Sequence, residues 1–240
     1  MSLILAAHGT RRPGGVAMIG DLAAKVSALV ERTVQVAFVD VLGPTPSEVL
    51  SSLPASSHRA VVVPAFLARG YHVRADLPAH VAASGHPNVT VTPALGPSRE
   101  IAQIVAQQLV KSGWRPGDSV ILAAAGTSDP RARADLRITT AQVSALTRSS
   151  VDLGFAATGD PHVCEAVERA RRRGRRVVVA SYLLADGLFH EVLRASGADI
   201  VTRPLGTHPE LARVIASRFQ TAMPRRCDAL LARRADANRA

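Results

Sequence analysis

The chain has 240 residues, enough for one large or two small domains with complete hydrophobic cores. Hydrophobic residues make up 47% of it and charged residues 20%, a balance that excludes a disordered chain. The formal net charge of +10 suits an acidic partner, either nucleic acid or a polycarboxylate, but it also suits mere solubility of an arginine-rich protein.

Uninterrupted apolar segments are short, so the sequence predicts no membrane-spanning helix and no membrane partner. The opening MSLILAAHGT lacks the basic start of a signal peptide, and its apolar run has the length of a strand. Cys164 and Cys227 do not form a C-x-x-C pattern, so we expect no iron–sulfur cluster and no cysteine-bound zinc. These features together favour a cytoplasmic protein.

Short runs rich in Val, Ile and Ala alternate with longer helical stretches along the chain. In the first half we expect strands at 3–7, 34–40, 60–66 and 88–92, and helices at 15–31, 46–53, 74–84 and 98–111. In the second half we expect strands at 119–125, 151–156, 176–183 and 199–202, and helices at 130–147, 161–173, 188–196 and 208–220. Strand–helix alternation of this length predicts right-handed βαβ units and a parallel sheet in each half.

The second half repeats the first. Residues 3–10 read LILAAHGT and residues 120–127 read VILAAAGT, with six of eight positions identical at an offset of 117. A second match, at an offset of 110, relates Leu95-Gly96 to Leu205-Gly206. Gly and Pro punctuate the GWRPG segment between the copies. We therefore expect an N-terminal domain at 1–115, a C-terminal repeat at 116–222 and a basic, disordered tail at 223–240.

His8 is the position at which the two copies of this segment differ in chemistry, because the second copy has Ala125 there. His8 ends the first expected strand, and the functional crevice of a parallel sheet lies outside the carboxyl ends of its strands. His72 follows the third expected strand, which neighbours the first in a flavodoxin-type order 2-1-3-4. Two facing neutral imidazoles would bind a divalent first-row metal and leave positions open. The duplication thus favours one site, carried by the first half and covered by the second.

Two segments carry a family resemblance. HGTRRPGG at 8–15 and PAFLARGYHVRADLP at 64–78 resemble the two signatures of the class II chelatases, the CbiX/SirB-type sirohydrochlorin chelatases. The resemblance covers about residues 1–222 and is to the duplicated long form. It implies an α/β protein of two tandem chelatase-like (flavodoxin-like) domains, each a four-stranded parallel sheet flanked by helices, with a cleft between them. It also implies that His8 and His72 are both the catalytic residues and the metal ligands.

The resemblance further implies that a tetrapyrrole, sirohydrochlorin, is the partner molecule. A divalent metal (Fe²⁺, or alternatively Co²⁺ or Ni²⁺) would be a second substrate, and no organic cofactor is expected. Sirohydrochlorin carries eight carboxylates, and arginine pairs with carboxylates in a bidentate manner. The arginines that flank the two motifs are therefore expected to bind it: Arg11, Arg12, Arg69 and Arg74.

Three further residues are secondary candidates. Asp76 could orient His72 or a bound metal, although an aspartate in the first turn of a helix is equally ordinary. In the second copy, the segment YLLADGLFHEVL resembles residues 66–77, and its His190 and Glu191 could line the roof of the cleft. The residue aligned with His72 is Phe189, so His190 falls one position late.

The resemblance implies an enzyme, a sirohydrochlorin ferrochelatase that makes sirohaem. A cobaltochelatase of anaerobic cobalamin synthesis and a non-catalytic metal or tetrapyrrole carrier stay open as alternatives. Iron is favoured because the chain lacks the His-rich segment of some cobalt and nickel relatives. A nucleic-acid-binding protein is disfavoured, since aromatic residues are only 3% of the chain and no groove-reading motif is present. We expect a monomer, because the second copy supplies the partner face.

Overall fold

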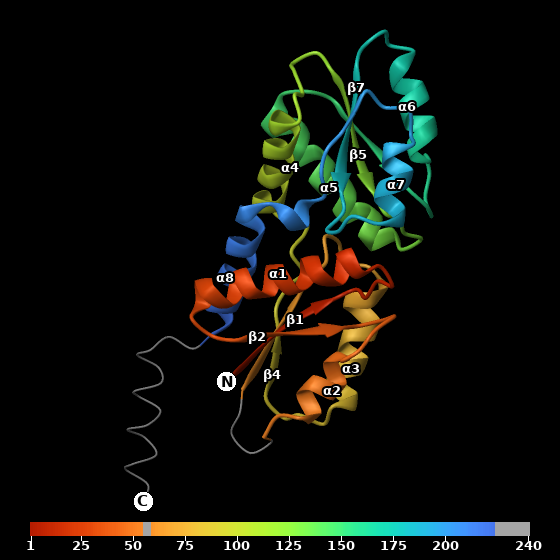
Figure 1. The fold of residues 1–240 in the computed structure, drawn as a ribbon. Helices are drawn as coiled ribbons and strands as arrows, with labels where there is room; N and C mark the ends of the chain where they lie inside the picture. The colour runs from red at the N-terminus through yellow and green to blue at the C-terminus, as the bar shows by residue number, and fades with distance from the viewer. Residues whose placement is uncertain (55–58, 224–240) are drawn as a thin grey trace, which may run out of the picture.

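Two four-stranded parallel sheets, one from each half of the chain, form the framework of the computed structural model, which describes residues 1–54 and 59–223 (Figure 1). The first sheet has the order β2-β1-β3-β4, with β1 (Ser2–Ala7), β2 (Val34–Phe38), β3 (Ala60–Pro64) and β4 (Val89–Val91). The second has the order β6-β5-β7-β8, with β5 (Ser119–Ala124), β6 (Val151–Phe155), β7 (Val177–Tyr182) and β8 (Ile200–Val201). The expected α/β class and the strand order 2-1-3-4 are therefore confirmed in both halves.

Helices connect these strands at the positions that the sequence predicts, with small differences at their ends. The first half contains α1 (Pro13–Val30), α2 (Pro46–Ser51), α3 (Leu77–Ala83) and α4 (Arg99–Lys111). The second contains α5 (Pro130–Thr147), α6 (Val163–Arg171), α7 (Leu188–Arg194) and α8 (Pro209–Ala222). A turn of π-helix, η1 (His72–Asp76), precedes α3, and a short 3-10 turn, η2 (Leu205–Thr207), precedes α8. The tail expected at 223–240 lies outside the described residues except for its first residue.

Local chemistry explains where several helices begin. Proline, whose fixed φ suits the first turn, is the first residue of α1, α2, α5 and α8. Thr45 and Glu48 form a reciprocal capping box at the start of α2. Ser98 and Asp129 cap α4 and α5 by accepting backbone N–H groups. These capping residues allow the helix starts to be predicted from the sequence.

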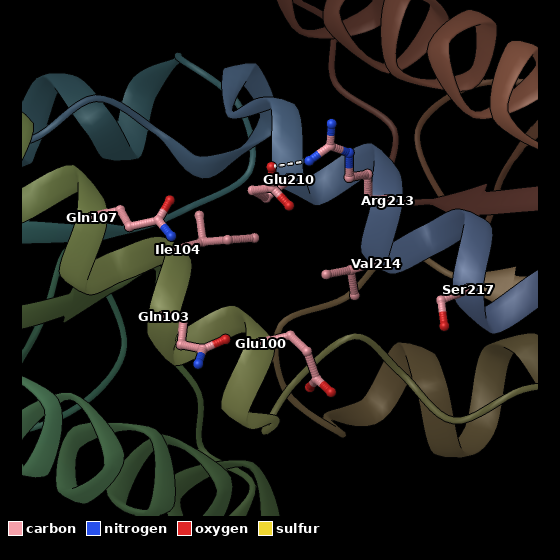
Figure 2. A pocket seen from close by; sticks show the side chains of 8 residues that line it. All are labelled: Glu100, Gln103, Ile104, Gln107, Glu210, Arg213, Val214 and Ser217. Atoms are coloured by element: carbon pink, nitrogen blue, oxygen red, sulfur yellow. Dashed lines mark hydrogen bonds and ion pairs between the residues drawn. The ribbon is translucent and has the colours of Figure 1, made fainter.

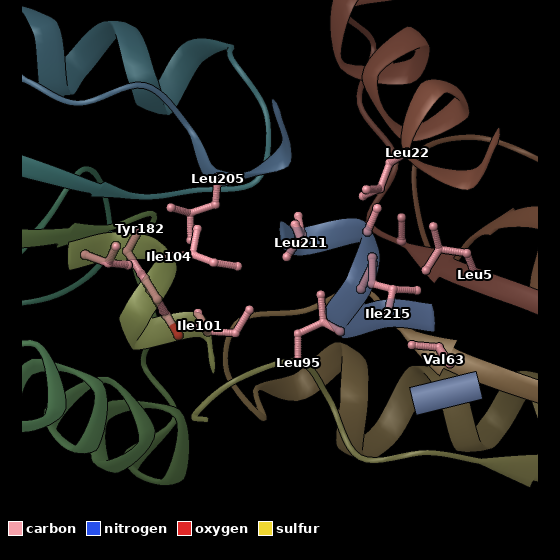
Figure 3. Close-up of a cluster of buried hydrophobic side chains, with 14 of the residues drawn as sticks. Leu5, Leu22, Val63, Leu95, Ile101, Ile104, Tyr182, Leu205, Leu211 and Ile215 are labelled. Atoms are coloured by element: carbon pink, nitrogen blue, oxygen red, sulfur yellow. The ribbon is translucent and has the colours of Figure 1, made fainter. Parts of the chain in front are cut away.

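Each sheet is covered on one face by a helix from the other half. The last helix of the first half, α4, packs against β7 and α5, whereas α8 packs against β3 and α1. Figure 1 shows α8 alongside α1 and α4 beside the second sheet. Figure 3 shows Leu211 and Ile215 of α8 close to Leu5, Leu22 and Val63 of the first half. The sequence repeat divides the chain near residue 115, but the two halves have exchanged their last helices.

The exchange produces one central core shared by both sheets. Side chains on alternate positions of a strand face opposite sides, so Leu3 and Leu5 of β1 enter this core while Ile4 and Ala6 face an outer cluster with Val62. The second sheet has a matching outer cluster. Both faces of each sheet are thus buried, which is why the strands are almost continuously apolar.

Helix α1 is the one helix of the described residues that is long and apolar enough to cross a membrane, with 18 residues and a hydropathy of 1.3. Its buried positions, Ile19, Leu22 and Val26 among them, lie on one stripe, and α1 packs against α8 and β2. Asp21 and Lys25 are exposed on its other face. Core helices meet the same criteria of length and composition, and these contacts place α1 in the core.

Tyr182 links the two halves from within the central core. Its hydroxyl donates to the carbonyl of Leu67 at 2.9 Å and lies 3.3 Å from the hydroxyl of Thr139, and burial raises the pKa of this tyrosine. Leu67 belongs to the loop that carries the second motif. We expect Tyr182→Phe to lower the free energy of unfolding by about 1–2 kcal/mol, because the Leu67 carbonyl loses its donor.

Urea unfolding measures this change, with Tyr71→Phe as the control because Tyr71 is 66% exposed. Equal stability of the Tyr182→Phe variant and the unmodified protein would show that the hydrogen bond to Leu67 does not join the halves.

Candidate metal centre

The two predicted histidines lie side by side. The centroids of the His8 and His72 rings are 4.6 Å apart, with the rings at 88° to each other. His8 directly follows β1, and His72 begins η1 after the loop that leaves β3. These strands are hydrogen-bonded neighbours with Ala6 opposite Pro64, so both histidines come from the same edge of the sheet. The strand order therefore brings the two imidazoles together.

Asp40 completes the cluster, and the sequence analysis missed it. It follows β2, the other neighbour of β1, and its carboxylate lies with the ring nitrogens of His8 and His72 so that one ligand atom from each is within 4.8 Å of the others. His8 and Asp40 are exposed, and His72 is half-buried. Imidazole nitrogen and carboxylate oxygen together suit Fe²⁺, Co²⁺ and Ni²⁺ and leave coordination positions open.

The duplication contains a signal that would have identified Asp40. The strand registers preserve the offset of 117, since Leu3 pairs with Val61 and Val120 pairs with Val178. At this offset each member of the cluster has a counterpart that cannot bind a metal. The pairs are His8 with Ala125, Asp40 with Ala157, and His72 with Phe189. The second half therefore lacks all three ligands.

Gly9 allows the His8 loop to approach Asp40. A Cβ at Gly9 would lie 2.1 Å from the carbonyl oxygen of Asp40 and 3.1 Å from the nitrogen of Leu42, so any side chain would push the two loops apart. The same contact recurs in the second half, where a Cβ at Gly126 would lie 2.5 Å from the carbonyl oxygen of Thr158. The glycine of the first motif thus serves close packing between neighbouring loops.

Both imidazoles are oriented through Nδ1. In His72, Nδ1 is 2.6 Å from Oδ2 of Asp76 within η1, and in His8 it is 2.7 Å from the carbonyl oxygen of Gly9. A carbonyl oxygen or a carboxylate accepts a hydrogen bond, so each Nδ1 carries the proton and each Nε2 keeps its lone pair. Carboxylate–histidine pairs of this kind fix the ring orientation at metal sites. Asp76 thus occupies the orienting position considered for it.

Three of the four predicted substrate-binding arginines pair with carboxylates of the second half. Arg12 forms a bidentate ion pair with Glu191, and Arg74 forms an ion pair with Asp129. Arg69 pairs with Asp135. The fourth, Arg11, is exposed and makes no side-chain hydrogen bond or ion pair with residues 1–54 or 59–223. The three ion pairs join segments that follow strands of the first sheet to the start of α5 and to α7 in the second half, a contact region we call the junction.

The pair between Arg69 and Asp135 differs from the other two because its carboxylate is completely buried. Asp135 accepts hydrogen bonds from the Arg69 guanidinium, at 2.6 Å from Nη2 and 3.0 Å from Nε. It also accepts one from the backbone N–H of Arg69 at 2.8 Å. A buried carboxylate needs such compensation. Arg69, which we expected to bind the substrate, is thus engaged as the counter-ion of a core residue.

The two secondary candidates of the second half have different surroundings. His190 is buried, with Nδ1 at 3.0 Å from Oδ1 of Asp186 and Nε2 at 3.0 Å from the carbonyl oxygen of Thr202. Both of its ring nitrogens are occupied within the second half. Glu191 lies at the junction, where it pairs with Arg12. Of these two residues, only Glu191 faces the first half.

A groove of about 250 Å³ lies between α4 and α8, apart from the histidines (Figure 2). Its lining consists of Glu100, Gln103, Ile104 and Gln107 from α4 and Glu210, Arg213, Val214 and Ser217 from α8. These residues form four pairs at the offset of 110, so the groove is where the exchanged helices meet around the axis of the duplication. None of the predicted site residues lines it.

Comparison with known proteins agrees with the architecture. The family model for CbiX matches residues 2–112 and 119–222. A sirohydrochlorin cobaltochelatase of Methanopyrus kandleri is 32% identical over 80 residues, which are 32% of this chain and 56% of the relative. The chain thus spans about half the length of that curated relative.

Solved structures share the fold at low sequence identity. SirB from Bacillus subtilis with Fe³⁺ has a TM-score of 0.77 and 17% identity, covering 91% of this chain and 94% of its own. SirB from Bacillus subtilis subspecies spizizenii, in complex with cobalt, has a TM-score of 0.72 and 18% identity, with coverages of 90% and 92%. CbiX, described as the terminal enzyme of sirohaem synthesis in denitrifying bacteria, has a TM-score of 0.71 and 21% identity, with coverages of 93% and 100%. Because the family model covers both halves, from the first strand to the last helix, the chain belongs to the CbiX family.

Proposed function

We propose that the protein is a chelatase that inserts Fe²⁺ into the macrocycle of sirohydrochlorin to make sirohaem. The observation that carries this proposal is the cluster of His8, Asp40 and His72 at one sheet edge in a chain of the CbiX family. A related SirB structure contains Fe³⁺, which supports iron. The metal is a substrate here, so the cluster must release it as well as bind it.

The ligand set suits both binding and release. Three protein ligands leave coordination positions for pyrrole nitrogens, whereas a closed four-ligand site would retain the ion. Insertion of M²⁺ also releases two protons from the two pyrrole N–H groups of the free macrocycle. As the ion leaves, Nε2 of His8 and Nε2 of His72 become free, and each can accept one of these protons. Asp76 stabilises the imidazolium that then forms at His72, since its carboxylate faces Nδ1.

Cobalt is the alternative metal substrate. The Methanopyrus kandleri relative is a cobaltochelatase, and a SirB structure contains cobalt. Two imidazoles and a carboxylate bind Fe²⁺ and Co²⁺ alike, so the ligands do not choose between them. We further propose that the chain acts as a monomer, because its second half covers the first at the junction as a partner subunit would. We also propose a cytoplasmic location, on the sequence features given above.

An anaerobic absorbance assay tests the function. Sirohydrochlorin is mixed with Fe²⁺, Co²⁺ or Ni²⁺, with and without the protein, and the spectrum of the metallated product is followed. We expect the protein to accelerate insertion, most strongly with Fe²⁺. Faster insertion of Co²⁺ would assign the cobalt role instead, and binding of the macrocycle without acceleration would identify a carrier.

A further inference from the structure

Two ion pairs of the junction are related by the duplication. Arg12 pairs with Glu191, and Arg74 pairs with Asp129. At the offset of 117, the counterpart of Arg12 is Asp129 and the counterpart of Arg74 is Glu191. The same contact therefore occurs twice, and in both cases the first half supplies the arginine and the second half the carboxylate. Arg69–Asp135 has no such twin, since their counterparts are Asp186 and Met18.

Both arginines belong to the segments that hold the metal ligands. Arg12 is four residues after His8 in the loop that follows β1, and Arg74 lies within η1, which His72 begins. The two arginines are thus anchored on the same segments as two of the metal ligands. Each already binds a carboxylate, which is the chemical group that the rim of sirohydrochlorin presents.

These two pairs can be separated at little cost. The side chains of Arg12 and Glu191 are 48% and 50% exposed, so Glu191 would be hydrated after losing its partner. The side chains of Arg74 and Asp129 are 39% and 12% exposed, and the Asp129 carboxylate keeps the backbone N–H of Arg131 at 2.8 Å as a second donor. An exposed ion pair such as Arg12–Glu191 contributes little to stability, and Asp129 keeps a hydrogen bond when Arg74 leaves. In contrast, Asp135 is fully buried, so without the Arg69 guanidinium its charge would keep only one backbone N–H as a donor and no contact with water.

We propose that Arg12 and Arg74 bind two carboxylates of the macrocycle, and that Glu191 and Asp129 occupy these arginines while no macrocycle is bound. When the macrocycle binds, each arginine exchanges the protein carboxylate for a substrate carboxylate. This inference rests on the proposed function. The two acidic residues then compete with the substrate, weaken its binding and favour release of the metallated product. Because two arginines must find new partners, the exchange selects macrocycles with several carboxylates. Arg69–Asp135 and the Tyr182 hydrogen bond keep the halves joined throughout.

The test measures affinity rather than turnover. Metal-free uroporphyrin, which carries eight carboxylates, is the probe, and its fluorescence is titrated with protein at two salt concentrations. Glu191→Gln should tighten binding by about two- to fivefold, the range that an exposed ion pair corresponds to, and Asp129→Asn by at least as much because Asp129 is less exposed. Asparagine caps a helix as well as aspartate does, so α5 keeps its start in the second variant. Arg12→Gln and Arg74→Gln should weaken binding by about tenfold or more.

Matched controls distinguish the exchange of carboxylates at Arg12 and Arg74 from a simple change in net charge. Glu165→Gln and Asp152→Asn remove the same charge from exposed ion pairs with Arg169 and Arg173, also in the second half. We expect these controls to change the affinity far less than Glu191→Gln and Asp129→Asn do. Equal effects in controls and variants, or weaker binding by the variants, would overturn the exchange while leaving the chelatase proposal standing. Failure of the unmodified protein to bind uroporphyrin and sirohydrochlorin would overturn both.

Discussion

Replacing His8 or His72 with alanine is expected to lower the rate of metal insertion by at least about 100-fold, because each variant loses both a metal ligand and a proton acceptor. Asp40→Ala should lower metal affinity and insertion together. Asp76→Asn should have a smaller effect, about 10- to 100-fold, since it weakens the orientation of His72 and the stabilisation of its imidazolium but removes no metal ligand. Anaerobic insertion assays and Co²⁺ titrations followed by absorbance measure the two quantities separately.

The control for these substitutions is His162→Asn, which removes an imidazole from a helix start of the second half and keeps a capping side chain there. It should leave insertion unchanged. His8 and Asp40 lie on loops, His72 begins η1, and all three are at least partly exposed, so thermal melting of their variants should match that of the unmodified protein. Near-full activity of either histidine variant would show that the reaction takes place elsewhere.

A large loss of stability is expected from Asp135→Ala. This substitution leaves the backbone N–H of Arg69 without its partner and opens a cavity where a fully buried side chain was, whereas the Arg69 guanidinium, 56% exposed, can be hydrated. We therefore expect a loss of about 2–3 kcal/mol in urea unfolding.

Arg69→Met should cost more, about 3–5 kcal/mol, because it leaves the buried Asp135 charge with only the backbone N–H of residue 69 as a donor. The double variant Arg69→Met/Asp135→Leu should recover much of the loss, since hydrophobic replacements of a buried pair are often neutral or better. A double variant no more stable than the singles would show that packing, and not charge compensation, is what Asp135 contributes. Arg213→Met, at an exposed pair with Glu210, is the surface control.

The strand pattern allowed the sheets and the meeting of His8 with His72 to be predicted, because successive βαβ units place strand ends at one edge whatever the loops do. Asp40 was harder to find because an aspartate after a strand is common in turns, and only the alanine at the matching position of the second half, Ala157, distinguishes it. The partner of Arg12 lies 179 residues away along the chain, and no local pattern encodes such a pairing. Hydrophobic periodicity likewise shows that α4 and α8 have apolar faces, but not which sheet each one covers.

The exchange of α4 and α8 sets the order in which the protein can mature during synthesis. The first half leaves the ribosome with the apolar faces of α1 and β3 uncovered, because the helix that covers them occupies residues 209–222. Meanwhile α4 is complete before β7, the strand it packs against, has been translated. The nascent chain therefore depends on its final described helix to close its earliest core. A break between the repeats would yield two fragments that need each other, not two independent proteins.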